Sequence, residues 1–269
     1  MLKLTGYQLR DYVFSRRFIL MISIVAILGA ILTAVVGYYR PAMFLASPGA
    51  FYATLWGGGV TIVIIFAGVI FGGDAIAGEF QNKTGYFLMG LPLRRATVYV
   101  GKYIAAFIAA LAAVVFYAVL VLANSAYYFG ASALTTTFGE SFVLATVYLL
   151  ALLGATFLFS SLFKTSTYAV LVVAVLFLFG FTLLQDLISG LVHVTPWFIL
   201  TYADTIIGGV FNTSCMSNPG THTCPSSFPG GAAMTVTNAT IPEGVAIMVA
   251  YFVITAIVGL ILFEREEFT

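Results

Sequence analysis

One group of residues that could do chemistry lies in residues 74–102, between two long apolar stretches. The segment holds two acidic and four basic residues: Asp74, Glu79, Lys83, Arg94, Arg95 and Lys102. The stretch from Thr84 to Leu91 is mostly apolar, yet it is too short to cross a bilayer. A plain connector would be shorter and more polar. The segment is therefore predicted to dock a soluble partner protein.

The sequence lacks the phosphate-binding motif of an ATP-hydrolysing enzyme and the mid-membrane ionisable groups of an ion-coupled carrier. It has no Gly-x-x-x-x-Gly-Lys-Ser/Thr phosphate loop, so the chain is not expected to hydrolyse ATP by that route. Ion-coupled carriers place ionisable groups at mid-membrane, whereas here Asp74, Lys102, Lys164 and Asp186 fall near the ends of the apolar stretches. We therefore expect a non-catalytic protein that binds no cofactor or metal of its own. A secondary carrier or channel and a non-transporting membrane scaffold are the alternatives.

A second group of reactive residues lies in segment 189–244, which contains no Lys or Arg. Both cysteines of the chain, Cys215 and Cys224, lie there, and this favours a disulfide in an oxidising exterior. Together with His222 they could instead ligate a metal, but their spacing matches no common zinc motif. The segment also contains two N-glycosylation sequons, which begin at Asn212 and Asn238.

The composition decides what kind of element must position these residues. Of the 269 residues, 61% are hydrophobic and only 8% are charged, whereas soluble domains carry about 25% charged residues. No water-soluble fold of this size could bury that much apolar surface. The composition excludes a soluble enzyme, a nucleic-acid-binding domain and a disordered chain, and it leaves an integral membrane protein.

A helix needs about 20 mostly apolar residues to cross a bilayer, and six stretches of the chain are long enough. They are residues 18–39, 51–73, 103–127, 142–163, 168–188 and 245–263. These stretches are apolar all round, whereas the strands of a membrane barrel would alternate apolar and polar residues. We therefore predict an all-α integral membrane protein in which residues 1–269 form a single transmembrane domain with six transmembrane helices.

The basic residues predict the orientation of these helices. Ten of the eleven Lys and Arg residues lie before the first span, between spans two and three, between spans four and five, or after span six, and Arg40 is the exception. Basic residues concentrate on the cytoplasmic side of a membrane. Both termini are therefore predicted to be cytoplasmic, in a multi-pass protein of the cell membrane.

Residues 1–17 carry a helical pattern of their own. Lys3, Arg10 and Arg17 are seven residues apart and share one stripe, while Leu2, Leu9 and Val13 share another. This spacing predicts a short amphipathic helix that lies in the lipid headgroup region. A frayed tail with cytoplasmic charges is the alternative.

Glycines are unusually frequent in the second span, at Gly57, Gly58, Gly59, Gly68, Gly72 and Gly73. Small residues let helices approach one another closely. The pattern is compatible with packing inside the chain and equally with contact between two copies of it.

Segment 74–102 resembles the permease subunit of type-2 ATP-binding cassette (ABC) exporters, particularly the branch that includes the copper-site maturation permease of nitrous oxide reductase. The matching positions are Asp74, Gly78-Glu79, Thr84-Gly85, Leu91-Pro92, Arg94-Arg95 and Gly101-Lys102. The resemblance extends to nearly the whole chain. It includes the six spans, the two cytoplasmic ends, the amphipathic N-terminal helix and the long outer segment before span six.

The resemblance implies a permease that moves its substrate outward by alternating access while separate subunits hydrolyse ATP. Two ABC ATPase subunits, which carry the ATP and Mg²⁺, would bind below the membrane, and the second permease would be an identical copy or a paralogue. A coupling helix at about Gln81–Met89 would sit in a groove of the ATPase. The residues implied to couple the two subunits are Glu79, Asn82, Lys83, Thr84, Gly85, Tyr86, Pro92, Arg94 and Arg95.

The resemblance also implies that outer segment 189–244 forms re-entrant helices near the exit of the transport path. The apolar stretch from Thr195 to Val210 would suit that role. The polar stretch 212–240 departs from the family pattern, and it could contact an extracellular partner protein or only shield the exit. Apart from the lipid bilayer, no further partner is implied, and no nucleic acid is expected.

Overall fold

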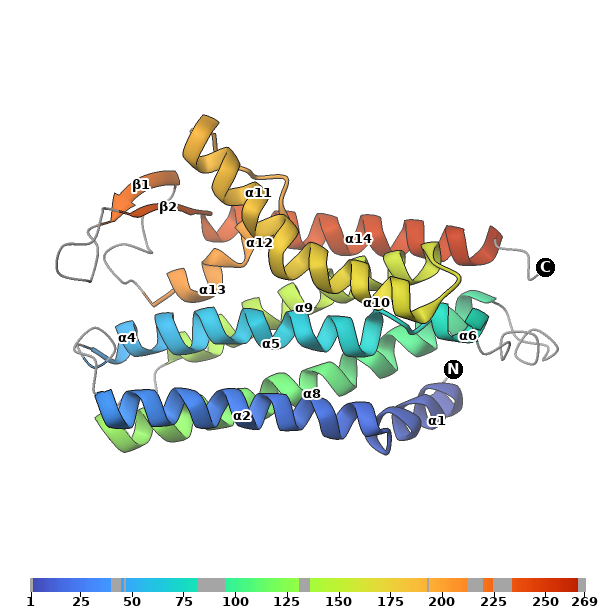
Figure 1. Ribbon diagram of the computed structural model, residues 1–269, viewed down its shortest axis with the longest axis horizontal. Helices are drawn as coiled ribbons and strands as arrows, with labels where there is room; N and C mark the ends of the chain where they lie inside the picture. Colours follow the sequence, from blue (N-terminus) through green and yellow to red (C-terminus); the bar gives the residue numbers. More distant parts are fainter. Residues whose placement is uncertain are drawn as a thin grey trace.

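The computed structural model describes residues 2–39, 45, 47–81, 95–130, 136–192, 194–211, 220–224 and 234–265 (Figure 1). Within these ranges, six helical stretches are long and apolar enough to cross a membrane. Most of them run roughly along one direction as a bundle, and the fifth, which begins at Ser166, is tilted away from the others. The prediction of an all-α integral membrane protein with six spanning helices is therefore confirmed.

Four of the spanning helices are continuous, whereas the second and the fifth change geometry along their length. The continuous ones are α2 (Arg16–Tyr39), α8 (Arg95–Phe129), α9 (Thr136–Leu162) and α14 (Ile241–Arg265). The second span joins α4 (Pro48–Phe51), the π-helical segment η1 (Tyr52–Gly58), α5 (Gly59–Ala67) and η2 (Gly68–Gly72), and α6 (Ala77–Gln81) follows it. The fifth span joins α10 (Ser166–Val175), η4 (Leu176–Gly180), α11 (Phe181–Leu187) and η5 (Ile188–Val192).

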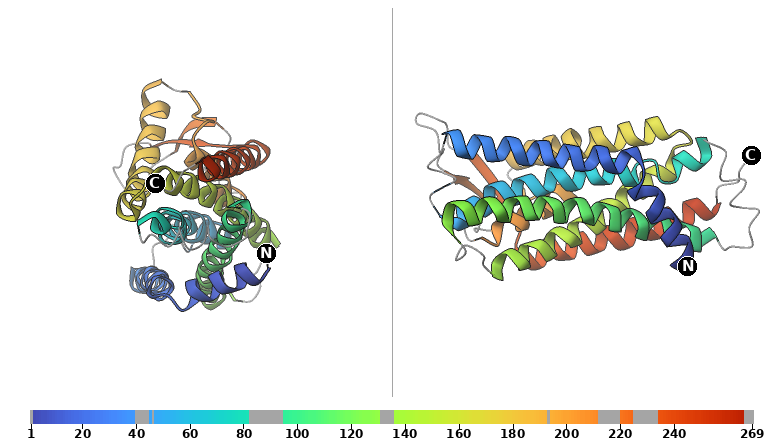
Figure 2. Two further views of the ribbon diagram at one scale, coloured as in Figure 1. Left: turned by 90° about the vertical axis from the view of Figure 1, so that its right-hand side faces the viewer. Right: turned by 90° about the horizontal axis from the view of Figure 1, so that it is seen from below.

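The second span forms the centre of the bundle. In its most apolar window, 78% of the residues are buried, against 22% for α2 and 17% for both the fifth span and α14. The outer helices expose large apolar side chains, among them Ile31, Leu171 and Ile257. In the left view of Figure 2, which looks along the bundle, α5 lies inside it and α2 and α14 lie at its edge. In a bilayer such exposed faces contact lipid or another subunit.

Glycines of the second span serve packing inside the chain. A Cβ on Gly57 would lie 2.7 Å from the Cα of Gly208, and a Cβ on Gly68 would lie 2.2 Å from a methyl group of Leu152 in α9. At Gly57 the neighbour is backbone, so only glycine permits this approach, whereas at Gly68 the neighbour is the end of the flexible Leu152 side chain. The structure thereby shows packing inside the chain at Gly57 and Gly68, and contact between two copies through other glycines of this span stays a prediction.

The two ends of the bundle differ. The helix α1 (Leu2–Val13), α6 and the last turn of α14 lie at one end, called here the α1 end (Figure 1). The helix α1 lies within the stretch 1–17 in which the sequence predicts an amphipathic helix, and it packs against α8. The short helix α13 (Thr205–Gly209) and a two-stranded ribbon lie at the other end, called the hairpin end.

The ribbon was not predicted from the sequence. Strand β1 (Gly220–Cys224) pairs antiparallel with β2 (Met234–Asn238), so that Gly220 stands opposite Asn238 and Cys224 opposite Met234. Two five-residue strands rich in Thr give a weaker signal than a spanning helix, because their pattern is short. Cys215 and Asn212 lie outside the described residues, so the disulfide to Cys224 and a glycan at Asn212 stay predictions.

Candidate functional site

The structure describes the two ends of the predicted coupling segment. Glu79 and Gln81 lie in α6, and Arg95 begins α8. The other residues implied to couple an ATPase lie outside the described residues: Asn82, Lys83, Thr84, Gly85, Tyr86, Pro92 and Arg94. The candidate site is therefore the segment of residues 74–81, called here the stem, which directly precedes residues 82–94 in the chain.

Lys102 holds this stem to the third span. Its Nζ donates a hydrogen bond of 2.8 Å to the carbonyl oxygen of Ala75 and forms an ion pair with the carboxylate of Glu79. The helix α8 begins at Arg95 rather than near residue 103, where the span was predicted, so Lys102 lies within a helix and is 8% exposed. The sequence motif contained Lys102, but sequence reasoning missed its role, because nothing in the spacing shows that it reaches back to Glu79.

Two further contacts fix the stem to the fourth and fifth spans. The hydroxyl oxygen of Ser160 accepts hydrogen bonds from the backbone N–H groups of Ile76 (3.0 Å) and Ala77 (3.1 Å), where the chain leaves η2 and starts α6. Helix starts leave N–H groups without intrahelical partners, and Ser160 of α9 satisfies two of them. The side-chain oxygen of Gln81 accepts a hydrogen bond of 2.8 Å from the backbone N–H of Ser166, the first residue of α10.

The first span and α1 join the same cluster. The guanidinium of Arg17 in α2 lies 2.6 Å from the carboxylate of Asp74, which is 7% exposed. The hydroxyl of Tyr12 in α1 donates to the carbonyl oxygen of Phe71 at 3.4 Å. Burial, and then the nearby charge of Asp74, raise the pKa of Tyr12, so its phenol stays a neutral hydrogen-bond donor.

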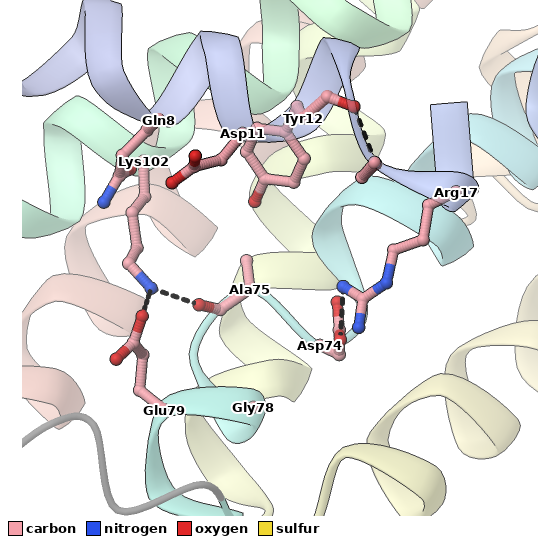
Figure 3. Close-up of a pocket in the computed structure, with 10 residues that line it drawn as sticks. Gln8, Asp11, Tyr12, Arg17, Asp74, Ala75, Gly78, Glu79 and Lys102 are labelled. Carbon is pink, nitrogen blue, oxygen red and sulfur yellow. Dashed lines mark hydrogen bonds and ion pairs between the residues drawn. The ribbon is translucent and has the colours of Figure 1, made fainter. Parts of the chain in front are cut away.

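These side chains surround a pocket of about 240 Å³ (Figure 3). Figure 3 shows the pair Lys102–Glu79 on one side of the pocket and the pair Arg17–Asp74 on the other. The pocket is lined by Gln8, Asp11, Tyr12, Ser15, Arg17, Asp74, Ala75, Gly78, Glu79 and Lys102. The arrangement is a polar junction through which a displacement of the stem would reach spans one, three, four and five.

At the hairpin end, a buried network holds the outer segment to the bundle. The indole N–H of Trp56 donates to the hydroxyl oxygen of Ser141 at 2.9 Å, and the Ser141 hydroxyl donates to the carbonyl oxygen of Ile207 in α13 at 2.6 Å. The short helix α12 (Leu200–Ala203) is fully buried and packs against α14. Residues that the sequence predicts as re-entrant thus form two short helices inserted at the end of the bundle.

Asp204 lies at the corner between α12 and α13, beside Tyr148 of α9. Burial raises the pKa of its carboxyl from 3.8 to about 8, although the neighbouring Tyr148 hydroxyl lowers it in part. Both ion pairs found among the described residues lie at the α1 end, and segment 189–244 contains no Lys or Arg. Burial therefore favours the protonated form of the Asp204 carboxyl.

Asn238, one of the two candidate glycosylation sites, is 3% exposed. Its carbonyl oxygen accepts a hydrogen bond of 3.1 Å from the hydroxyl of Tyr202 in α12. A glycan is bulky and needs a surface position, so a modified Asn238 would have to leave this buried place, and glycosylation there stays a prediction.

The comparison with known families agrees with the architecture. A family model described as "ABC-2 family transporter protein" matches residues 4–268, which is nearly the entire chain. Among curated proteins, none matches the chain significantly. Members of this family are the membrane components of transporters that work with ABC ATPases. The six spanning helices of this chain are consistent with such a membrane component. The chain therefore belongs to the ABC-2 family of transporter proteins and is the multi-pass membrane permease of an ABC transporter.

Proposed function

We propose that this permease belongs to an exporter and that it couples ATP hydrolysis by separate ATPase subunits to substrate movement through alternating access. The branch that includes the copper-site maturation permease of nitrous oxide reductase is the group within the family to which we assign it. In this proposal two ATPase subunits, which bind the ATP and Mg²⁺, dock at the α1 end. A second permease, identical or paralogous, completes the complex.

The observation that supports this proposal is the anchoring of the stem. Residues 74–81 contact α8 through Lys102, α9 through Ser160, α10 through Ser166 and α2 through Arg17. A subunit that grips residues 82–94 would therefore pull on four spans at once. Such a connection suits a motor that drives a rigid-body change, whereas a loop without anchors would absorb the displacement.

The orientation in this proposal places the α1 end in the cytoplasm. The basic residues Arg10, Arg16, Arg17 and Lys102 lie at this end, and the described part of segment 189–244 lies at the other. Positive charge on the cytoplasmic side is the general pattern in membrane proteins. ATP and the ATPases then share a compartment with the stem.

The first test is isolation of the tagged full chain from its host in mild detergent, followed by identification of the proteins that come with it. An ABC ATPase recovered in equal amount supports the proposal. Recovery of the chain without any ATPase contradicts it and favours a carrier or a scaffold.

The second test measures coupling without knowledge of the substrate. A fluorophore on Ile241→Cys, in a chain whose two cysteines are replaced by Ser, reports ATP-dependent movement at the hairpin end of the isolated complex. Glu79→Gln is expected to keep ATP hydrolysis and to lose most of the fluorescence change, because the neutral amide cannot form the ion pair with Lys102. The matched control is Glu140→Gln, which alters an exposed residue of α9 at the hairpin end. An unchanged response in Glu79→Gln would show that the stem does not transmit the movement.

A further inference from the structure

A second hollow lies beside the polar pocket of the α1 end. It has a volume of about 560 Å³, within the range of about 300–1,000 Å³ that is usual for ligand sites. Its walls come from α2, η2 and α10, and they are mainly apolar: Leu20, Val69, Ile70, Val170 and Leu171. Both α2 and α10 pack against η2 and flank it (Figures 1 and 2). Because Leu20 and Leu171 at its rim are about half exposed, this apolar crevice opens at the surface of the chain, where the acyl chain of a bilayer lipid could enter it.

The crevice and the polar pocket share two residues, Arg17 and Asp74. The ion pair thus stands at the boundary between an apolar hollow and a polar one, at the end of the bundle that holds α1. Ser166 and Thr167 are the other polar residues that line the crevice. Together the two hollows form an amphipathic site, with room for an apolar chain on one side of the ion pair and a polar head on the other.

The charges and hydrogen-bonding atoms of this site indicate which head would fit. Asp74 uses one carboxylate oxygen for Arg17, while its second oxygen, Oδ1, is buried and has no hydrogen-bond partner. The side-chain oxygen of Gln8 in the same pocket is also buried without a partner. Buried acceptors without donors cost about 1–3 kcal/mol each, so an occupant with N–H donors is favoured. Arg17 remains 54% exposed and can accept a further anionic group.

We propose that the crevice and the polar pocket together bind a phospholipid of the bilayer whose head carries a primary amine, as in phosphatidylethanolamine. The ammonium group donates to Asp74 Oδ1 and the phosphate faces Arg17, while one acyl chain lies along Val69, Val170 and Leu171. A head with a primary ammonium supplies hydrogen bonds that a quaternary choline head cannot. The site thereby distinguishes two lipids of the same net charge. This proposal depends neither on export nor on ATP coupling.

The test is native mass spectrometry of the full chain in mild detergent, with lipids of identical acyl chains and three heads: ethanolamine, choline and glycerol. We expect the ethanolamine lipid to be retained at least fivefold more than the choline lipid. Asp74→Asn should remove this preference, because the amide no longer offers a charged acceptor, and Val170→Trp should reduce retention of the ethanolamine lipid by filling the crevice. Glu140→Gln, at the opposite end, should retain lipid as the unchanged chain does.

Equal retention of the ethanolamine and choline lipids by the unchanged chain would overturn the proposal. So would an Asp74→Asn chain that keeps the preference while its thermal unfolding is unchanged. If Asp74→Asn does not fold, Gln8→Leu removes the second free acceptor at a less buried position and must weaken the same preference. Loss of the bound lipid on addition of ATP to the ATPase complex would identify an exported amphiphile and would contradict a resident bilayer lipid.

Discussion

At the scale of single residues, Lys102 has the clearest consequence. It is 8% exposed, and its ammonium group supplies the hydrogen-bond donor for the Ala75 carbonyl and the positive charge for Glu79. Removal of one partner from a buried pair costs more than the pair itself contributes, because the other charge stays in a poorly solvated place. Substitution on either side of this pair should therefore destabilise the chain.

Lys102→Met is expected to destabilise the chain by about 2 kcal/mol, which corresponds to a fall in Tm of about 4–8 °C for a chain of this size. Glu79→Gln should also destabilise the chain, because it leaves the buried ammonium of Lys102 without its counter-charge, although the amide oxygen can still accept one hydrogen bond from Lys102. Thermal unfolding of both variants in the same detergent measures both effects. If Lys102→Met melts with the unchanged chain, the contact contributes nothing to the folded state.

Asp204 predicts a dependence of stability on pH. In the folded chain its pKa is raised to about 8 from the ordinary value of 3.8. The folded state therefore binds more protons than the unfolded state between about pH 4 and pH 8. By linkage, this group makes stability fall as pH rises through that interval. Among the described titratable groups, Tyr148 is the one that affects the pKa of Asp204. The carboxylate of Glu243 in α14 instead affects the pKa of Tyr202.

The Asp204→Asn variant should remove this component. We expect its Tm to change less between pH 5.5 and pH 8 than that of the unchanged chain, by at least about 2 °C. Measuring both proteins in the same buffers cancels the titration of all other groups. A parallel pH dependence in the two proteins would show that Asp204 is ionised in the fold.

At the scale of elements, a glycine of the second span lets a neighbouring helix approach it closely. The backbones of η1 and α13 approach so closely at Gly57 and Gly208 that no Cβ fits between them. Gly58, the next residue along the chain, has nothing within 4 Å of its Cβ position. Neighbouring glycines of one π-helical segment thus differ entirely in their surroundings, and this gives a matched pair of substitutions.

Gly57→Ala is expected to destabilise the chain by about 1–3 kcal/mol, because a backbone must shift to admit the methyl group. Gly58→Ala should be neutral or slightly stabilising, since alanine restricts the unfolded chain. The comparison of Tm values in detergent tests whether α13 packs on η1 in solution as it does in the structure. Equal effects of the two substitutions would contradict this contact.

At the scale of the whole molecule, the six spans place α1 and α6 at one end and α13 with the ribbon at the other (Figure 1). The proposed function requires the α1 end to be cytoplasmic. Two exposed residues report on the two ends: Lys164, which precedes α10 near the stem, and Glu140, near the start of α9.

We expect a membrane-impermeant thiol reagent to label Glu140→Cys in intact cells and to leave Lys164→Cys unlabelled until the membrane is opened. Both variants are made in the chain without its own cysteines, because these lie in segment 189–244. Labelling of Lys164→Cys in intact cells would reverse the orientation and remove the stem from the compartment of ATP.

The sequence by itself determined the class of the molecule. Six stretches of about 20 apolar residues predict spanning helices, because a helix satisfies its own backbone within the bilayer and these stretches lack the alternation of barrel strands. The amphipathic spacing of residues 1–17 and the Gly-Glu motif at Gly78-Glu79 likewise depend only on the order of residues along the chain. The motif by itself therefore indicates the stem as a candidate site.

Only the tertiary structure decided which of these residues meet. Lys102 and Glu79 are 23 positions apart, Gln81 and Ser166 are 85 apart, and Arg17 joins Asp74 from another span. Such pairs depend on how the helices pack, and the packing depends on close approaches such as Gly57 to Gly208 that no periodicity reveals. The buried state of Asp204, the buried Asn238 and the amphipathic site at Arg17 and Asp74 have the same origin, because burial is a property of the assembled helices.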